Sequence, residues 1–340
     1  MPTTSPVSEK LAFGTTVADH MLNATYDKGQ WSDWNIEPFH ALQLAPTAMV
    51  FHYGQSIFEG MKAFRMADER ISIFRIKKHW QRFCASAERM CMPAIPEELF
   101  TEGLKSLVAT DAAWVPEAAD GSLYLRPFLF ATEERFGVGV SERYQFLTFS
   151  GPVQSLYNKP LRVKVEDHYI RAAHGGVGYA KCAGNYGGAL YPTQLAKKEG
   201  YDQVLWTDGS PELNIEESGT MNVAFVIDGK LVTPALSDTI LDGVTRDSFL
   251  TIARQWGMAV EERPISAWEL VDAAAEGKLE EAFGFGTAAV AAPIAVIGIK
   301  EKELQLPELT DAAFCMRARR HLSDIRRGLA PDRYGWNTIV

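Results

Sequence analysis

The sequence contains few cysteines, no excess of basic residues and no long apolar run. The four cysteines, at positions 84, 91, 182 and 315, form neither a Cys-x-x-Cys pair nor a zinc-ligand spacing, so reduced thiols are the simplest interpretation. The formal net charge of -9 argues against a nucleic acid or an anionic membrane surface as partner. No apolar run is long enough to span a bilayer as a helix.

Targeting and metal-binding signals are also missing. Residues 1–10 lack the basic and apolar segments of a signal peptide, so we expect the protein in the cytoplasm. The histidines, His52 and His174 among them, show no metal-ligand spacing, and we predict no metal site. The sequence also has no internal repeat and no low-complexity segment.

The length and the apolar content are those of a large globular protein. With 340 residues, of which 46% are hydrophobic, the chain can bury a large core, and typical domain sizes suggest two domains. Turn-forming residues gather between Gly151 and Pro160. We therefore expect an N-terminal domain over residues 1–152, an interdomain linker over 153–160 and a C-terminal domain over 161–340.

Apolar periodicity predicts short strands and amphipathic helices. A turn at Asp228-Gly229 lies between two apolar runs and predicts a hairpin of residues 220–227 with 230–233. Other strands are expected at Val50 to His52, at Tyr124 to Phe130, from Leu161 onward and at Asp202 to Thr207. Helices are expected around Arg82, between about Val244 and Gly257, and from Thr310 to about Gly328, the last with Phe314, Ala318, Leu322, Ile325 and Leu329 on one face.

One lysine, Lys181, follows the glycine-rich run 175–178 and precedes Tyr186 by five residues. A lysine among small residues leaves room beside it for a flat ring, and an uncharged amine there can attack a carbonyl. Pyridoxal phosphate is the cofactor that needs such an amine. A phosphate loop needs Ser or Thr directly after its lysine, and Cys182 stands there. The segment by itself is equally compatible with a surface lysine in a flexible loop.

A pyridoxal phosphate site also needs an acid and a place for the phosphate. Glu216 and Glu217 precede the predicted hairpin, although acids in such positions are often solvated. Gly243 comes just before the predicted helix that ends near Gly257. The dipole at the start of a helix stabilises a bound anion by ~0.3–1 kcal/mol. Every amphipathic helix has such an end, so this signal is weak alone.

Taken together, the motifs resemble those of branched-chain amino-acid aminotransferases, which belong to the class IV pyridoxal phosphate enzymes. The likeness extends from about Phe13 to the C-terminal tail. The motifs occur in the order and spacing of that family: Phe58-Glu59-Gly60-Met61-Lys62-Ala63-Phe64, Tyr124-Leu125-Arg126-Pro127, Lys181 to Tyr186, Glu217 to Asn222, Gly243 to Arg246 and Gly286-Thr287-Ala288.

The resemblance implies a two-domain α/β protein of fold type IV, with a smaller N-terminal α/β domain and a larger C-terminal pseudo-barrel domain. The implied activity is the reversible transamination of L-leucine, L-isoleucine and L-valine with 2-oxoglutarate, in a homodimer with shared active sites. Its partners would be amino acids and 2-oxo acids, and its cofactor pyridoxal 5'-phosphate.

The resemblance also implies a role for each residue of the cofactor site. Lys181 would anchor the cofactor covalently and carry the proton, Tyr186 would bind the ring hydroxyl oxygen, and Glu217 would face the pyridine nitrogen. Arg82 would hold the phosphate. It lies off the apolar stripe of its predicted helix, however, so a surface arginine is the alternative. That stripe consists of Trp80, Phe83, Cys84, Ala87 and Cys91, and the remaining cofactor contacts are expected from Leu241, Val244, Thr245 and Thr287.

For the substrate, the resemblance implies an aromatic and aliphatic pocket. Such a lining binds a branched side chain through burial, which contributes ~25 cal/mol for each Å² of apolar surface removed from water. Tyr53 and Arg126 are the candidates for binding the gamma carboxylate of glutamate. The alpha carboxylate would bind to the backbone turn at Thr287 and Ala288 and to the Tyr124 hydroxyl. The lining would consist of Phe13, Tyr53, Phe58, Thr220 and Ala288, closed by Tyr124, Arg126 and Val138 from a second subunit. Without the resemblance, Phe13, Phe58 and Val138 would be read as ordinary core.

Three other functions remain open. D-amino-acid aminotransferases of the same class typically bind the carboxylate with an Arg-x-His pair, but no histidine occurs between Asp120 and Val140. Aminodeoxychorismate lyases typically lack the Tyr124-to-Pro127 pattern. A cofactor-binding protein without turnover is disfavoured by the complete set of site residues. Some family members carry two cysteines where this chain has Ala289 and Ala292, which excludes a thiol switch there.

Overall fold

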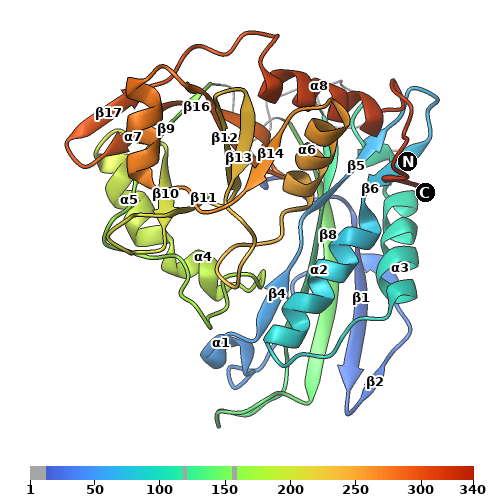
Figure 1. Cartoon of the computed structure of the whole chain (residues 1–340). Coiled ribbons are helices and arrows are strands. Elements are labelled where there is room, and N and C mark those ends of the chain that lie inside the picture. Colours follow the sequence, from blue (N-terminus) through green and yellow to red (C-terminus); the bar gives the residue numbers. More distant parts are fainter. Residues whose placement is uncertain (1–12, 118–120, 155–158) are drawn as a thin grey trace. The chain divides into compact units, whose positions relative to one another are not determined.

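The computed structural model describes residues 13–117, 121–154 and 159–340 (Figure 1). The chain divides into two compact units. Unit 1 contains Met1–Leu156, Ala180–Gly184 and Ser323–Val340, and unit 2 contains Tyr157–Tyr179 and Asn185–Leu322. Of the predicted linker at 153–160, residues 155–158 lie outside the described residues.

Unit 1 is built on a nine-stranded sheet in which every pair is antiparallel. The order is β18-β6-β5-β7-β8-β1-β2, and β3 pairs with β1 and β4 with β7. The strands are β1 (His20–Asp27), β2 (Gln30–Trp31), β3 (Asn35–Pro38), β4 (Ser56–Phe58), β5 (Met61–Arg65), β6 (Ile71–Phe74), β7 (Ser122–Ala131), β8 (Arg143–Val153) and β18 (Asn337–Ile339).

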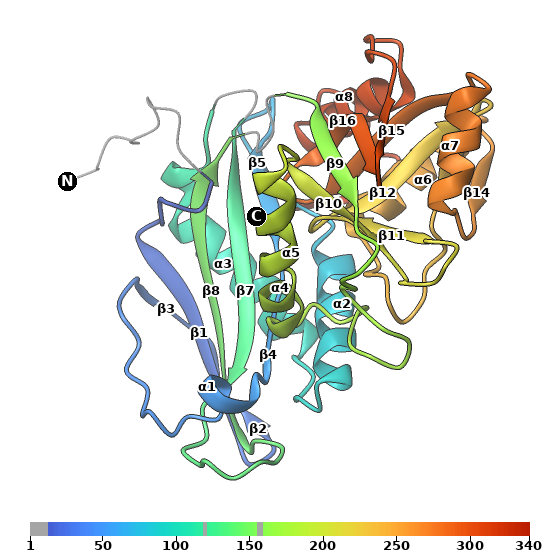
Figure 2. The ribbon, with the colours of Figure 1, turned by 90° about the vertical axis from the view of Figure 1, so that its left-hand side faces the viewer.

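Two long helices of unit 1 pack on one another and on this sheet. They are α2 (Ile76–Arg89) and α3 (Glu97–Thr110), which are coloured blue-green in Figures 1 and 2. Phe83 of α2 lies between α3 and the sheet, because its ring centroid is 5.5 Å from that of Phe100 and 5.7 Å from that of Phe146. Two short helices complete the unit, α1 (Val50–Tyr53) and the 3-10 turn η1 (Ala112–Trp114).

Unit 2 contains a second nine-stranded sheet, which mixes parallel and antiparallel pairs. The order is β11-β10-β9-β16-β15-β12-β13-β14, with β17 paired to β16. The strands are β9 (Leu161–Val165), β10 (Gln203–Thr207), β11 (Ile215–Ser218), β12 (Asn222–Ile227), β13 (Lys230–Thr233), β14 (Val260–Glu262), β15 (Leu279–Gly286), β16 (Val290–Ile299) and β17 (Lys302–Gln305).

Side chains satisfy free N–H groups at the start of two helices, α7 and α8. Ser266 caps α7 by accepting a hydrogen bond from the Glu269 N–H at 3.0 Å. The Glu281 carboxylate accepts bonds from the N–H groups of Phe314 and Cys315 at 2.6 and 2.9 Å and so holds the start of α8. The remaining helices are α4 (Gly184–Gly188), α5 (Leu190–Lys198), α6 (Val244–Gln255), α7 (Ala267–Ala275) and α8 (Phe314–Arg326). They belong to unit 2 except for Gly184 and residues 323–326, which are part of unit 1.

Most predicted elements are present. The strands at Tyr124 to Phe130, from Leu161 and at Asp202 to Thr207 are β7, β9 and β10, and the expected hairpin is β12 and β13. Its turn residues Asp228 and Gly229 have φ of 50° and 71°, the left-handed region that this hairpin turn requires. The expected helices are α2, α6 and α8.

Two local predictions are wrong. Residues Val50 to His52 belong to a helical turn, α1, because Gly54 with φ of 67° ends one turn of helix there before β4 begins. An apolar run of this length cannot distinguish a strand from a helix. Leu329 does not share the buried face of the last helix but is 66% exposed, because α8 ends at Arg326 and Gly328 turns the chain with φ of 69°.

Two segments that the predicted boundaries assign to the C-terminal domain belong to unit 1. Residues 323–340 do so because β18 pairs with β6. Residues 180–184 do so because the N–H of Phe58 donates to the carbonyl of Lys181 at 3.0 Å and that of Ala183 donates to Ser56 at 3.0 Å.

None of the helices in the described part of the chain is long and apolar enough to cross a bilayer. Among the same residues, no group of three or more His, Cys, Asp or Glu is placed to hold a metal ion. All four cysteines are free thiols.

We predict that Trp336→Ala lowers the free energy of unfolding by about 3 kcal/mol, the usual cost of truncating a buried aromatic side chain. Trp336 is buried beside β18, where its ring lies 4.1 Å from Tyr334, 5.7 Å from Phe74 and 5.0 Å from the Arg75 guanidinium. Urea unfolding followed by circular dichroism measures the effect. Trp268→Ala is the control, because that side chain is 37% exposed, and it should cost about 1 kcal/mol or less. Equal losses in the two variants would contradict the prediction.

Candidate active site

Lys181 is held in unit 1 through its backbone. Besides the bond to Phe58, its N–H donates to the Ser86 hydroxyl at 2.9 Å, and that hydroxyl donates to the Arg82 carbonyl at 3.0 Å. Cys182 pairs with Ile57 in an isolated antiparallel bridge. The lysine backbone is therefore bound both to the edge strand β4 and to helix α2, while its side chain remains half-buried.

The Lys181 side chain lies beside an aromatic and cationic cluster of the same unit. Its Nζ is 4.7 Å from the centroid of the Phe58 ring, and the Arg126 guanidinium is 4.8 Å from that centroid. Arg126 donates to the Tyr124 hydroxyl at 3.0 Å, and the Tyr124 ring packs edge-on against Phe13 at 5.1 Å. Four of the predicted substrate residues thus form one continuous cluster next to the lysine.

Tyr124 and Arg126, which we expect to close the pocket of a neighbouring subunit, lie beside Phe58 of their own chain, and which subunit's pocket they serve stays a prediction. Both residues belong to β7, which pairs with β5 and with β4, the strand that ends at Phe58. Their reach toward Phe58 and Lys181 is therefore set within one chain. The sequence does not show this because strand pairing between distant segments leaves no local pattern.

Tyr53 and Val138 lie in a different part of unit 1. Val138 is 85% exposed and Phe136 79%, in the loop between β7 and β8, and the Tyr53 hydroxyl donates to the Phe136 carbonyl. Val140 and Phe51 are also exposed. We name Phe51, Phe136, Val138 and Val140 the exposed apolar group.

Arg82 is not a surface residue. It is buried, and its Nε and Nη2 donate to the two oxygens of Glu59 at 2.6 and 2.9 Å. The Nδ1 of His79 is 2.8 Å from Glu59 Oε2, which also accepts the Gly60 N–H at 3.0 Å. The carboxylate of Glu59 therefore fixes one edge of the guanidinium, in a cluster that is buried throughout.

The charges of this cluster follow from burial and pairing. Burial by itself would raise the pKa of Glu59, but the Arg82 guanidinium and His79 hold that pKa well below its ordinary value. Burial lowers the pKa of His79. The Glu59 carboxylate raises that pKa only in part, because the positive charge of Arg82 acts in the opposite direction. His79 is therefore neutral near pH 7 and donates from Nδ1, so the cluster contains one carboxylate and one guanidinium.

The apolar stripe predicted for this helix is correspondingly only partly right. Phe83 and Ala87 are buried, whereas Cys91 is exposed and lies beyond the end of α2. The buried face includes His79, Arg82 and Ser86, because their polar groups have partners inside unit 1. A hydrophobicity pattern cannot show such a face.

In unit 2, Glu217 is a buried acid on β11 rather than a solvated one. Its Oε1 accepts the Leu241 N–H at 2.9 Å, and its Oε2 is 3.2 Å from Nε of Arg171. The Asn222 side-chain amide donates to the Leu241 carbonyl at 2.9 Å and is 3.5 Å from Glu217 Oε1. Two side chains of the predicted hairpin region thus hold the backbone that leads into α6.

Helix α6 begins at Val244, as the anion-site prediction requires. Val244 and Thr245 are buried in its first turn, and Gly243 precedes them in an extended conformation. A side chain at position 243 would collide with the side chains of Asn222 and Arg246, so glycine is needed there. Leu241 is half-exposed just before this turn.

Thr287 and Ala288 form the turn between β15 and β16 and are half-exposed. The turn ends at Val290, whose φ of 63° lies in the left-handed region. A β-branched residue is strained there by about 1–2 kcal/mol, which identifies this turn as a constrained one. Thr220 is exposed in the turn between β11 and β12, and Tyr186 is half-buried in α4.

Sequence reasoning assigned no role to several residues that the structure places next to the predicted ones. Glu59 was quoted within a motif, and a charged residue between Phe58 and Gly60 is a signal that could have been used. Ser86 and Arg171 leave no such signal, because each acts through contacts with segments far away in the sequence.

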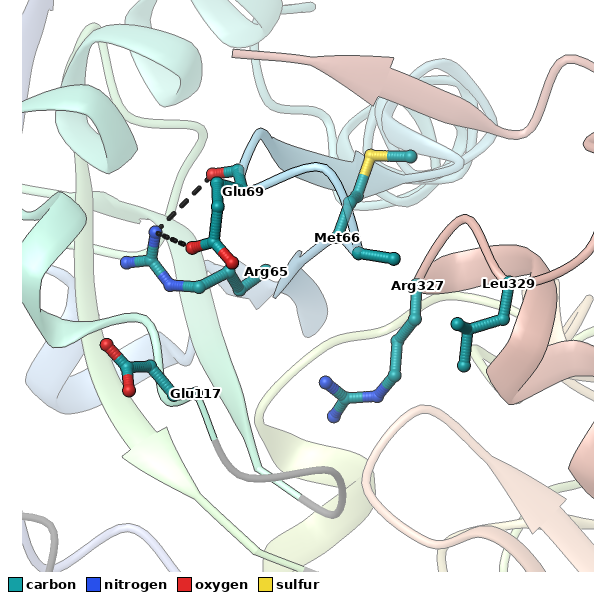
Figure 3. A pocket seen from close by; sticks show the side chains of 7 residues that line it. Arg65, Met66, Glu69, Glu117, Arg327 and Leu329 are labelled. Carbon is teal, nitrogen blue, oxygen red and sulfur yellow. Dashed lines mark hydrogen bonds and ion pairs between the residues drawn. The ribbon is translucent and has the colours of Figure 1, made fainter.

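A surface pocket of about 340 Å³ also occurs in unit 1 (Figure 3). Within it, Arg65 points toward Glu69, to whose carbonyl it donates at 3.4 Å. The pocket is lined by Arg65, Met66, Ala67, Glu69, Glu117, Arg327 and Leu329, none of which is a predicted site residue.

Comparison with known proteins identifies the class. The family model described as Amino-transferase class IV matches residues 56–297, which include Phe58, Lys181 and Glu217. The chain therefore belongs to the class IV aminotransferases.

The more specific likeness is to branched-chain enzymes. Branched-chain-amino-acid aminotransferase 2 of Bacillus subtilis (strain 168) is 42% identical, over 98% of this chain and 93% of that protein. Branched-chain-amino-acid transaminase 1 of the same strain is 42% identical, over 98% of this chain and 96% of that protein.

A solved structure supports the fold. The branched-chain amino acid aminotransferase of Thermobaculum terrenum, in its PLP-bound holo-form, has a TM-score of 0.77 over 96% of this chain and 99% of that one. Its sequence identity is 21%, so this likeness concerns the fold alone. Together with the relatives above, it confirms the predicted family and fold class.

We predict that Glu59→Gln destabilises the protein by about 3 kcal/mol near pH 7, because it leaves the buried guanidinium of Arg82 without its carboxylate. Thermal unfolding as a function of pH measures this. Because the folded pKa of Glu59 lies below its ordinary 4.5, its stabilisation is present above that pH and is lost as the pH falls. The difference between wild type and variant should therefore narrow below pH 4.5. Glu102→Gln, which breaks an exposed pair with Lys105, is the control and should change stability by less than about 0.5 kcal/mol. A pH-independent difference would show that the charge of Glu59 is not responsible.

Proposed function

We propose that this protein catalyses the reversible transfer of the amino group of L-leucine, L-isoleucine and L-valine to 2-oxoglutarate, with pyridoxal 5'-phosphate as cofactor. The observation that carries the proposal is the identity of 42% with named branched-chain enzymes over almost the whole chain. D-amino-acid transfer and lyase activity have no comparable support.

The residues present fit this cofactor. A phosphorylated pyridine aldehyde needs an amine, an acid for its ring nitrogen and donors for its phosphate. Lys181 offers the amine, and Glu217 offers a carboxylate that is buried and already oriented by Leu241 and Arg171. Donors for the phosphate would be Arg82, the first turn of α6 at Val244 and Thr245, and the Thr287 hydroxyl. Tyr186 would bind the ring hydroxyl oxygen and Leu241 would pack on the ring.

When bound, the cofactor withdraws electrons from the substrate carbon that loses its proton. The amine of Lys181 would accept that proton from the alpha carbon of the amino acid, so one residue would act as anchor and as acid/base. The Glu217 carboxylate would face the ring nitrogen and, when ionised, would keep that nitrogen protonated. Arg82 would bind the cofactor phosphate, which does not react. Its orientation is fixed by Glu59, so its role would be binding rather than catalysis.

The cluster beside Lys181 accounts for both kinds of substrate. The rings of Phe13 and Phe58 offer apolar surface to a branched side chain, and Ala288 and Thr220 stay predicted members of the same lining. The Arg126 guanidinium and the Tyr124 hydroxyl offer a cation and a donor for a carboxylate, which the side chain of glutamate carries. Tyr53 remains a candidate for the same carboxylate.

The proposal includes a homodimer, in which the two subunits contribute other residues to each site than the resemblance implies. Tyr124 and Arg126 would act in their own chain, where Arg126 packs on the Phe58 ring and donates to the Tyr124 hydroxyl. Val138 is the residue that a second chain would contribute, because it belongs to the exposed apolar group, and such a group normally marks an interface. The dimer and a cytoplasmic location both stay predictions.

Lys181→Ala should abolish transamination of L-leucine and leave the unfolding temperature within a few degrees of wild type, because it removes a half-buried side chain. The exposed Lys197→Ala is the control and should retain full activity. Borohydride reduction of the holoenzyme followed by peptide mapping identifies the anchor. A phosphopyridoxyl label on another lysine contradicts the assignment.

Mixing inactive variants under conditions that exchange subunits tests which residues of a site come from the same chain as Lys181. Lys181→Ala chains mixed with Val138→Asp chains should regain activity, since one site of each mixed dimer has both residues intact. Lys181→Ala mixed with Tyr124→Ala should not, because both residues act in one chain and each site of the mixed dimer then lacks one of them. Recovery with Tyr124→Ala, or none with Val138→Asp, would reverse the assignment.

A further inference from the structure

Arg171 connects three segments of unit 2 that carry predicted site residues or lead into them. It lies in the loop after β9, and its side chain is buried. Its Nε is 3.2 Å from Glu217 Oε2, a contact that is an ion pair rather than an aligned hydrogen bond. Its Nη2 donates to the carbonyl of Gly178 at 3.3 Å and to the carbonyl of Thr239.

The two carbonyls belong to the segments on which the site depends. Gly178 comes three residues before Lys181, in the glycine-rich run. Any side chain at position 178 would collide with Thr239 and Ala172, so the two segments are in close contact. Thr239 comes two residues before Leu241, whose N–H is bound to Glu217. One guanidinium therefore joins both backbone segments to the acid.

The neighbouring residue, Glu216, makes the contact with Glu217 informative. Both acids are buried on β11, and two adjacent carboxylates do not both ionise easily without a cation. Burial raises the pKa of Glu216, against a hydrogen bond with Thr239 and the charge of Arg171. Asp208 lies near Glu216, and His174 adds a more exposed charge. In this surrounding, the guanidinium forms its ion pair with Glu217.

We propose that Arg171 is a positioning residue, which pairs with the Glu217 carboxylate and fixes it relative to the segments before Lys181 and α6. This inference rests on the proposed function, in which Glu217 faces the ring nitrogen. Lysine cannot replace the guanidinium fully, because a single ammonium does not reach a carboxylate and two carbonyls in a planar fork.

The experiment is a double-mutant cycle on the holoenzyme. Arg171→Met, Glu217→Gln and the double variant are saturated with pyridoxal 5'-phosphate, and the single-turnover rate with L-leucine is followed by absorbance. Arg171→Met alone should slow this rate by about 10- to 100-fold, as expected for loss of an oriented charge. In the Glu217→Gln background the same change should slow it by less than about 3-fold, because the group through which Arg171 acts is already neutral.

Arg171→Lys and Arg263→Gln complete the design. Arg171→Lys keeps the charge and should lie between wild type and Arg171→Met, and it replaces Arg171→Met in the cycle if that variant does not fold. Arg263 forms ion pairs with Glu261 and Glu269 in the same unit and has no predicted role in the site, so Arg263→Gln should react at the wild-type rate.

The outcomes separate the inference from the function. If Arg171→Met slows the reaction by the same factor in both backgrounds, its role is general stabilisation and the inference is overturned. If Arg171→Met does not slow the reaction in the wild-type background, the inference is overturned as well. If wild type and Arg263→Gln themselves bind no cofactor or do not react with L-leucine, the proposed function fails, and the inference that rests on it fails too.

Discussion

The position of Lys181 depends on the pairing of three residues with an edge strand. The residues on either side of 180–184 belong to unit 2, yet this segment binds β4 through the backbone at Ser56 and Phe58. Backbone hydrogen bonds of this kind contribute only about 1 kcal/mol each, but they are directional and fix a register. They place the lysine beside the Phe58 ring and, through β7, beside Arg126 and Tyr124.

Buried ion pairs supply the second constraint, one in each unit. Glu59 with Arg82 in unit 1 and Glu217 with Arg171 in unit 2 have the same physical form, a buried carboxylate in contact with a guanidinium. Desolvation makes such pairs poor sources of stability, whereas removing one partner is costly. Their value is orientation, because an acid or a cation that cannot rotate presents a defined edge to a ligand. Both pairs contain a residue of the predicted cofactor site.

The exposed apolar group contrasts with these fixed centres. Phe51, Phe136, Val138 and Val140 are exposed on their own unit, whereas the cluster of Phe58, Tyr124 and Arg126 is packed on itself. The family motif at Tyr124 therefore belongs to a packed cluster and not to the exposed apolar group. A contact of the Val138 loop with another molecule stays a prediction.

The sequence by itself determined the family, the fold class and the candidate residues of the site, because these depend on motifs in a fixed order and on local periodicity. Phe58-Glu59-Gly60, the run before Lys181, and Gly243 before α6 are all local patterns of this kind. It failed where neighbours distant in the chain decide the outcome. The apolar stripe of α2 did not show that Arg82 is buried, because Glu59 and His79 make burial of a charge possible there. The motif at Tyr124 did not show that Arg126 lies against the Phe58 ring, because β7 and β4 meet only through sheet pairing. No local pattern pointed to Arg171, whose partners lie 7, 46 and 68 residues away along the chain. Tertiary structure decided these points because hydrogen bonds and ion pairs are short-range in space and indifferent to separation in sequence.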